Sequence, residues 1–188
     1  MNPQLQRIET EFRDARARLH RLREAVPRES WPVRPAPDRW SIADCVEHLN
    51  RTSEAFLPLL HSALSAASGA ARQPERRYRR DPLGFMLSVI MPPPVRLVRT
   101  KTSRPFEPTA VAPAAELVER FDLLQEEQLR CLRDADGLPL NEISIRSPFD
   151  ARARYNAYSC FVILPRHQHR HLWQAEQVAR ALRVPGSS

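Results

Sequence analysis

Apolar residues recur at helical spacing in four segments of the chain. In the first segment they advance by three and four residues in turn, from Leu5 to Val26, and Pro27 follows directly. This spacing places apolar side chains along one narrow face of a helix, as in a helical bundle. Proline cannot continue a helix because it lacks the backbone N–H. We therefore expect a first helix that ends at Pro27, followed by an irregular, proline-rich stretch from Trp31 to Trp40.

The second segment predicts a helix that begins after Ser41 and ends near Gly69. Ser41 is a favourable N-cap residue, and Asp44 lies three positions later, near the positive end of the helix dipole. Pro58 should kink this helix after Ala55. Its inward face carries apolar residues at helical spacing, namely Ile42, Cys45, Val46, Leu49, Phe56, Leu60 and Leu64.

Residues 70–112 are interpreted as a long crossover to the third helix. Seven prolines forbid a long regular helix there, although Leu83–Met91 is apolar enough for a short buried one. A loop of this length inside a compact domain usually serves as a lid or a partner surface, or is disordered.

The third helix is expected to begin near Pro113 and to end at Gly137. A short alternating piece, 143–145, indicates a weak strand or an extended link, and the fourth helix should cover 154–184 with a kink at Pro165. Four amphipathic helices with one long connection between the second and the third predict an all-α fold, an antiparallel four-helix bundle.

Composition is that of an ordinary globular protein. A length of 188 residues suits a single domain over 1–188, and 42% of the residues are hydrophobic and 27% charged. No apolar run approaches the roughly 20 residues of a membrane-spanning helix, and the N-terminus lacks the apolar core of a signal peptide. Three cysteines without zinc-like spacing suit reduced thiols. We therefore expect a cytoplasmic protein that does not enter a membrane.

The net charge of +7 comes from one segment. Between Arg72 and Arg104 there are nine basic and two acidic residues, whereas the other twenty basic and twenty acidic residues cancel. A single basic segment and 7% aromatic residues give little support for nucleic-acid binding. The four arginines within 76–80 could instead bind an anionic substrate, or they belong to a solvated loop.

Three of the six histidines occur in the string HQHRH at 167–171. On a helix, His167 and His171 lie one turn apart on one face and His169 points to the far side, whereas on a strand all three would share a face. The flanking sequence favours a helix with the pair on its buried side. Imidazoles rarely lie on an apolar face unless their ring nitrogens have hydrogen-bond or other polar partners. His48 lies on the core side of the second helix and supplies a third imidazole.

Two imidazoles at positions i and i+4, with one from a facing helix, can place three nitrogens about 2.0–2.2 Å from one divalent ion. Such a set leaves coordination positions open, unlike a structural site. The alternative is a histidine pair at the surface or in a hydrogen-bonded core, without an ion. Cys45 precedes His48 by one turn and is interpreted as a small core residue. His20 and His61 lack a comparable partner and receive no role.

Two stretches resemble known sequences. Residues 40–49, WSIADCVEHL, combine a tryptophan, a helix cap and a histidine, and residues 167–174, HQHRHLWQ, match the pattern H-x-x-x-H-L-x-Q. Their order and spacing resemble the second and last helices of the DinB-like (damage-inducible, YfiT-like) four-helix bundle proteins. A looser similarity covers short pieces of 93–108 in the crossover. Pro165, two residues before the histidine pair, departs from the family's pattern.

The resemblance implies a divalent metal ion, often zinc, nickel or iron, held by His48, His167 and His171. It also implies homodimers. A small-molecule substrate is implied as well, since relatives include S-transferases that use low-molecular-weight thiols. An ion held by three neutral imidazoles should make a bound thiol or water lose its proton more readily. We therefore expect a metal-dependent enzyme for thiol S-transfer or hydrolysis. The alternative is a non-catalytic, stress-associated module that binds a metal or another ligand.

The sequence offers no convincing general base. Asp44 is better explained as a helix cap and Glu47 as a solvent-exposed residue. Gln174, three residues after His171, either orients a ligand or is a polar residue at the edge of the bundle. No Ser-His-Asp, P-loop or dinucleotide signature occurs.

Overall fold

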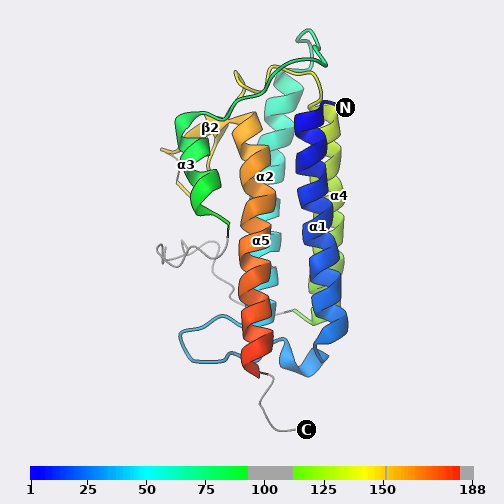
Figure 1. Ribbon diagram of the computed structural model, residues 1–188, viewed down its shortest axis with the longest axis vertical. Helices are drawn as coiled ribbons and strands as arrows, with labels where there is room; N and C mark the ends of the chain where they lie inside the picture. Colours follow the sequence, from blue (N-terminus) through cyan, green and yellow to red (C-terminus); the bar gives the residue numbers. More distant parts are fainter. Residues whose placement is uncertain (93–111, 151, 183–188) are drawn as a thin grey trace.

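Helices dominate the computed structural model, which describes residues 1–92, 112–150 and 152–182 (Figure 1). The described helices are α1 (Pro3–Ala25), the 3-10 helix η1 (Arg28–Ser30), α2 (Ile42–Ala66), α3 (Pro82–Ile90), α4 (Ala114–Asp134) and α5 (Ala157–Leu182). Two short strands, β1 (Ser144–Arg146) and β2 (Arg154–Asn156), form a small sheet. The prediction of a mostly helical fold is therefore confirmed. None of the described helices is long and apolar enough to cross a membrane.

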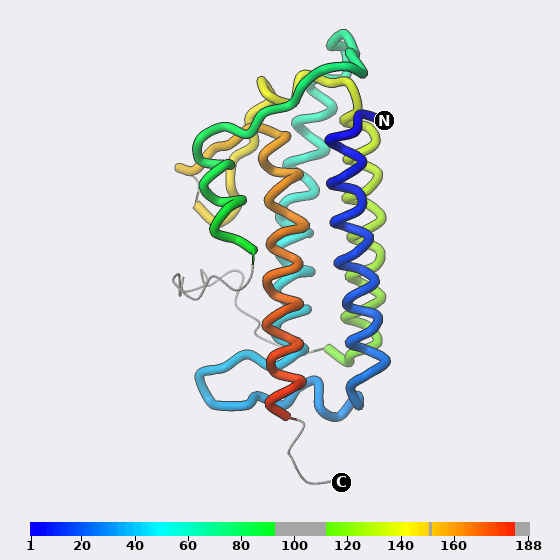
Figure 2. Tube along the Cα trace, in the orientation of Figure 1, coloured from blue at the N-terminus to red at the C-terminus, as the bar shows by residue number. Residues whose placement is uncertain are grey.

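The four long helices, α1, α2, α4 and α5, lie side by side along the long axis of the molecule (Figures 1 and 2). In Figure 1, α1 and α5 run downward, whereas α2 and α4 run upward. Both α1 and α2 pack against α4 and against α5. The neighbours α1–α4 and α2–α5 are thus antiparallel, whereas α1–α5 and α2–α4 are parallel, so the predicted antiparallel arrangement is found at two of these four contacts. Parallel neighbours arise because α2 ends near the top of Figure 1 and α4 begins near its bottom.

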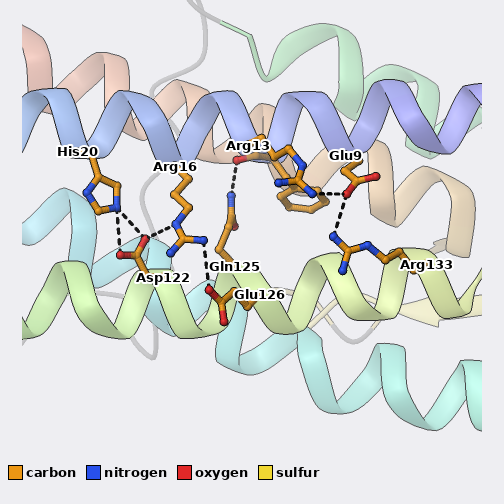
Figure 3. A network of polar contacts seen from close by, with 9 residues as sticks. Glu9, Arg13, Arg16, His20, Asp122, Gln125, Glu126 and Arg133 are labelled. Atoms are coloured by element: carbon orange, nitrogen blue, oxygen red, sulfur yellow. Dashed lines mark hydrogen bonds and ion pairs between the residues drawn. The ribbon is translucent and has the colours of Figure 1, made fainter.

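Apolar side chains at the predicted spacing fill the interior between these helices. On α1, every predicted inward position from Leu5 to Val26 is buried. Polar contacts flank this stripe: Arg16 and His20 of α1 both contact Asp122 of α4, at 2.8 and 3.0 Å (Figure 3). Partly exposed ion pairs of this kind contribute only about 0–1 kcal/mol each, so burial of the apolar stripe determines which face of α1 turns inward.

The start of α2 follows the predicted capping. The Ser41 hydroxyl accepts a hydrogen bond from the Asp44 N–H at 3.0 Å, and the Asp44 carboxylate accepts one from the Ser41 N–H at 2.9 Å. Asp44 is fully buried and also pairs with Arg34 at 2.8 Å. The cap fixes the first turn of α2 and therefore the position of the residues that follow it.

Both prolines that were expected to kink a helix, Pro58 in α2 and Pro165 in α5, lie inside continuous helices.

The short helix in the crossover is less buried than predicted. Within α3, which packs against α5, the buried residues are Gly84 and Ser88, whereas Phe85, Met86 and Val89 are 50–55% exposed. The prediction failed because it took the apolar run as a sign of burial on all sides. A short helix that packs against α5 and β2 on one side buries only that face.

The predicted strand at 143–145 has a partner that the sequence analysis missed. β1 pairs with β2 in antiparallel register, with Ile145 opposite Tyr155 and both side chains buried. The prediction that the last helix begins near residue 154 is therefore wrong, since residues 154–156 form β2 and α5 begins at Ala157. Three-residue strands carry too little periodicity to be recognised alone, because their pairing comes from tertiary contact.

Replacement of Gly84 by alanine should destabilise the docking of α3 on α5. An added Cβ would lie 2.1 Å from Oγ and 2.2 Å from Cβ of Ser159, whose hydroxyl donates to Asp81 at 2.7 Å. We expect the free energy of unfolding to fall by about 1–3 kcal/mol, the usual cost of overpacking. Denaturant unfolding measures this change. Gly69→Ala is the matched control, because no atom lies within 4 Å of its added Cβ; equal losses in both variants would contradict the packing argument.

Candidate metal centre

The structure brings together the three histidines that the sequence analysis singled out. His48 comes from α2, and His167 and His171 come from successive turns of α5. One ligand nitrogen from each ring can be chosen so that all three lie within 4.8 Å of one another. The Nε2 atoms of His48 and His167 are 3.2 Å apart, and the three ring centroids are separated by 4.4–5.1 Å. The three rings therefore converge on one point between the two helices.

Burial keeps two of these imidazoles neutral. The pKa of His167 is held well below its ordinary value by burial, and then by the nearby His48 and Arg170. Burial also holds the pKa of His171 well below its ordinary value, with further contributions from the other two histidines and Arg170 and a weak opposing effect of Gln174. A neutral imidazole has a free lone pair on one ring nitrogen. At neutral pH these side chains are thus in the form that binds metal ions.

The donor set fits a divalent ion. Nδ1 of His171 is buried without a hydrogen-bond partner among the described residues. A buried polar atom left without a partner is unfavourable, by about 1–3 kcal/mol, so such atoms are rare in native proteins. An unpartnered nitrogen within a cluster of buried imidazoles is the arrangement expected where an ion completes the contacts.

Two aromatic rings flank the cluster. The Trp40 ring lies 5.0 Å from the His48 ring and 5.7 Å from the His171 ring. The Phe149 ring lies 6.1 Å from the His167 ring and 6.5 Å from the His48 ring. Trp40 belongs to the stretch that resembles the DinB-like proteins, but Phe149, between β1 and β2, was missed. Only the pairing of these strands shows that this loop approaches the histidines.

The other histidines lie outside the cluster. Nε2 of His169 is 3.1 Å from the Glu11 carbonyl oxygen on α1. This ring therefore faces away from His167 and His171, as predicted. His20 contacts Asp122, as Figure 3 shows. His61 contacts Glu127 at 2.8 Å.

The interpretation of Glu47 as solvent-exposed is wrong. Its side chain is buried and forms ion pairs with Arg51 at 2.7 Å and with Arg120 of α4 at 3.1 Å. Each carboxylate oxygen of Glu47 is thus held by one guanidinium group. Cys45 is buried, as predicted, and burial raises the pKa of its thiol.

A buried amide network holds α5 beside the histidines. The Gln168 amide donates to the Oε1 atoms of Gln125 and Gln128 on α4, at 2.9 and 3.0 Å. The Gln125 amide donates to Gln168 at 3.0 Å and to the Phe12 carbonyl of α1 at 2.6 Å. The periodicity of the last helix predicts that Gln168 is buried, but no local pattern predicts its partners on α4. Because Gln168 directly follows His167, the network fixes the rotation of α5 about its axis at the histidine pair.

Several arginines of the crossover have partners within the protein. Arg80 donates to the Ser88 hydroxyl at 2.5 Å and lies over the Phe85 ring, and Arg76 lies 3.5 Å from a Glu142 oxygen. The sequence similarity noted within 93–108 falls in part of the chain outside the described residues. The described crossover residues thus contact α3 and the β1 region, and their predicted role in anion binding stays a prediction.

Comparison with known protein families gives a match over most of the chain. A sequence model described as the DinB superfamily matches residues 11–175, which include all three clustered histidines. No curated protein and no solved structure matches the chain.

Proposed function

Since the chain belongs to the DinB superfamily, we propose that His48, His167 and His171 hold a divalent metal ion and that the protein is a metal-dependent enzyme. Zinc, nickel and iron are the candidate ions, and thiol S-transfer or hydrolysis of a small molecule is the candidate reaction. The observation that supports this most strongly is the convergence of three buried imidazoles, with ligand atoms within 4.8 Å of one another. Three protein ligands leave positions open on the ion, as catalytic sites do.

When bound, the ion supplies Lewis acidity, which lowers the pKa of a coordinated thiol or water. The protein keeps His167 and His171 neutral by burial and so preserves their lone pairs for the ion. Trp40 and Phe149 lie beside the histidine rings and add apolar surface to the site. Their apolar surfaces favour a substrate whose reactive sulfur or carbonyl is attached to an apolar or aromatic group.

The finer features of the fold and setting belong to the same proposal. In this proposal the four long helices form a four-helix bundle, and residues 1–188 are a single domain. The proposed protein acts in the cytoplasm as a homodimer on a small-molecule substrate, and a low-molecular-weight thiol takes part if the reaction is thiol S-transfer.

The alternative is a non-catalytic module that binds a metal or another ligand. The pairing of Glu47 with Arg51 and Arg120 favours this alternative, because it leaves the carboxylate adjacent to His48 in the sequence without a free role as general base. A thiol or water activated by an ion can react without a separate base, since coordination itself promotes loss of the proton.

A panel of thiols and electrophiles, assayed with metal-free and metal-reconstituted protein, distinguishes the two. We expect turnover that requires added metal and disappears in His171→Ala but persists in His169→Ala, which faces α1. Metal that binds without any turnover across the panel would favour the binding module. Turnover at full rate in the presence of a strong chelator would contradict the proposed mechanism.

A further inference from the structure

A second group of metal-binding side chains lies at the contact between α2 and α4. We propose that His61, Glu127 and Cys131 form a divalent-metal site that is separate from the three-histidine cluster and has a donor set suited to zinc. The inference is independent of the proposed function, because it uses neither the same residues nor α5. It assigns a role to His61 and to a cysteine that the sequence analysis left without one.

The geometry repeats that of the first cluster. Glu127 and Cys131 are spaced i, i+4 on α4, so they lie one turn apart on one face, and His61 comes from the facing helix α2. Their donor atoms lie within 4.8 Å of one another, and Nε2 of His61 is 2.8 Å from a Glu127 oxygen. Donor atoms bound to one tetrahedral zinc ion are separated by about 3.5 Å, so small side-chain adjustments suffice. His61 follows His48 by thirteen residues, about 20 Å along a helix axis.

The charges of the three groups also suit a doubly charged ion. A thiolate and a carboxylate carry two negative charges, and the neutral imidazole completes a sulfur, oxygen and nitrogen set that zinc accepts. Before an ion binds, Cys131 is a thiol, because burial and then the charges of Glu127 and Asp134 raise its pKa to about 12. On binding, the S–H bond breaks, the sulfur donates its lone pair to the ion, and the proton passes to solvent. No electron is transferred.

Access to this site is from the surface. The His61 side chain is 51% exposed and the Glu127 side chain 26% exposed, whereas Cys131 is buried beneath them. An ion can therefore contact His61 and Glu127 from solvent before it reaches the buried thiol. It replaces the contact between His61 and Glu127, and it competes with Arg130, which also contacts Glu127.

Cobalt(II) titration of the reduced, metal-free protein tests this site, because a thiolate bound to cobalt gives a near-ultraviolet charge-transfer band that imidazoles do not give. The titration is carried out on the full chain with His48 and His171 both replaced by alanine, so that the first cluster does not contribute. We expect a band that saturates at one equivalent of cobalt, and competition with zinc should remove it.

Cys131→Ala should abolish the band, whereas Cys160→Ala, which replaces another buried core cysteine, should keep it. His61→Gln, a half-exposed position that leaves the core intact, should weaken cobalt binding at least tenfold, with folding checked by circular dichroism. Absence of a thiolate band, a band that survives Cys131→Ala, or unchanged affinity in His61→Gln would each overturn the proposal. None of these results bears on metal binding by the three histidines.

Discussion

Replacement of His48, His167 or His171 by alanine should lower the affinity of the cluster for zinc at least 100-fold, which corresponds to about 2.7 kcal/mol. Each ring supplies one of three ligand nitrogens, and these donor atoms lie within 4.8 Å of one another. The loss of any one ring therefore removes a third of the protein ligands of the ion. A water molecule that replaces the lost imidazole is a weaker ligand and leaves the remaining two rings as the only protein contacts. Competition with a chromophoric chelator measures the affinity of each variant.

The sequence offers a matched control within the same helix. His169 lies between two of the ligands but faces α1, where Nε2 is 3.1 Å from the Glu11 carbonyl oxygen. His169→Ala removes one imidazole from the same helical turn and should leave zinc affinity within about twofold of the wild-type value. If His169→Ala weakened zinc binding as strongly as His167→Ala, the assignment of the ligands would be wrong.

Acidification of the metal-free protein should destabilise it below about pH 6.5. In the unfolded chain His167 and His171 titrate near their ordinary pKa of about 6.5, whereas the folded protein holds both pKa values well below that. Above this pH both states are neutral and the histidines do not affect stability. Below it, the unfolded state binds protons that the folded state excludes, so the free energy of unfolding falls by up to about 1.4 kcal/mol per pH unit for each histidine.

Denaturant unfolding between pH 7.5 and 5.5, with a chelator present, measures this effect in a range where most carboxylates stay ionised. The reference is the double variant His167→Gln/His171→Gln, which removes both titrating groups and should show a markedly flatter dependence on pH. Parallel curves for the wild type and the double variant would show that other groups cause the loss of stability.

Local spacing predicted much of this protein. The stripe of α1 and the cap at Ser41 depend on residues within a few positions of each other, and so does the placing of His167 and His171 on one face with His169 opposite. These features are consequences of helical periodicity, which can be read from one segment at a time.

Contacts between distant segments account for what the sequence could not reveal. The pairing of β1 with β2 and the approach of Phe149 to the histidines depend on how loops cross the ends of the helices. Likewise, Glu47 was expected to be exposed because it is charged, but Arg120 on α4 compensates for its burial. No local pattern indicates which charged residue has a distant partner.

The proposed chemistry depends on one ion at the point where the three histidine rings meet, and diffraction from crystals of zinc-loaded protein tests this directly. Data collected on both sides of the zinc absorption edge should give one anomalous peak about 2.0–2.2 Å from a nitrogen of each of His48, His167 and His171. The contrary result is a map without a peak at that position, in which the three imidazoles are turned apart and hydrogen-bonded to protein groups.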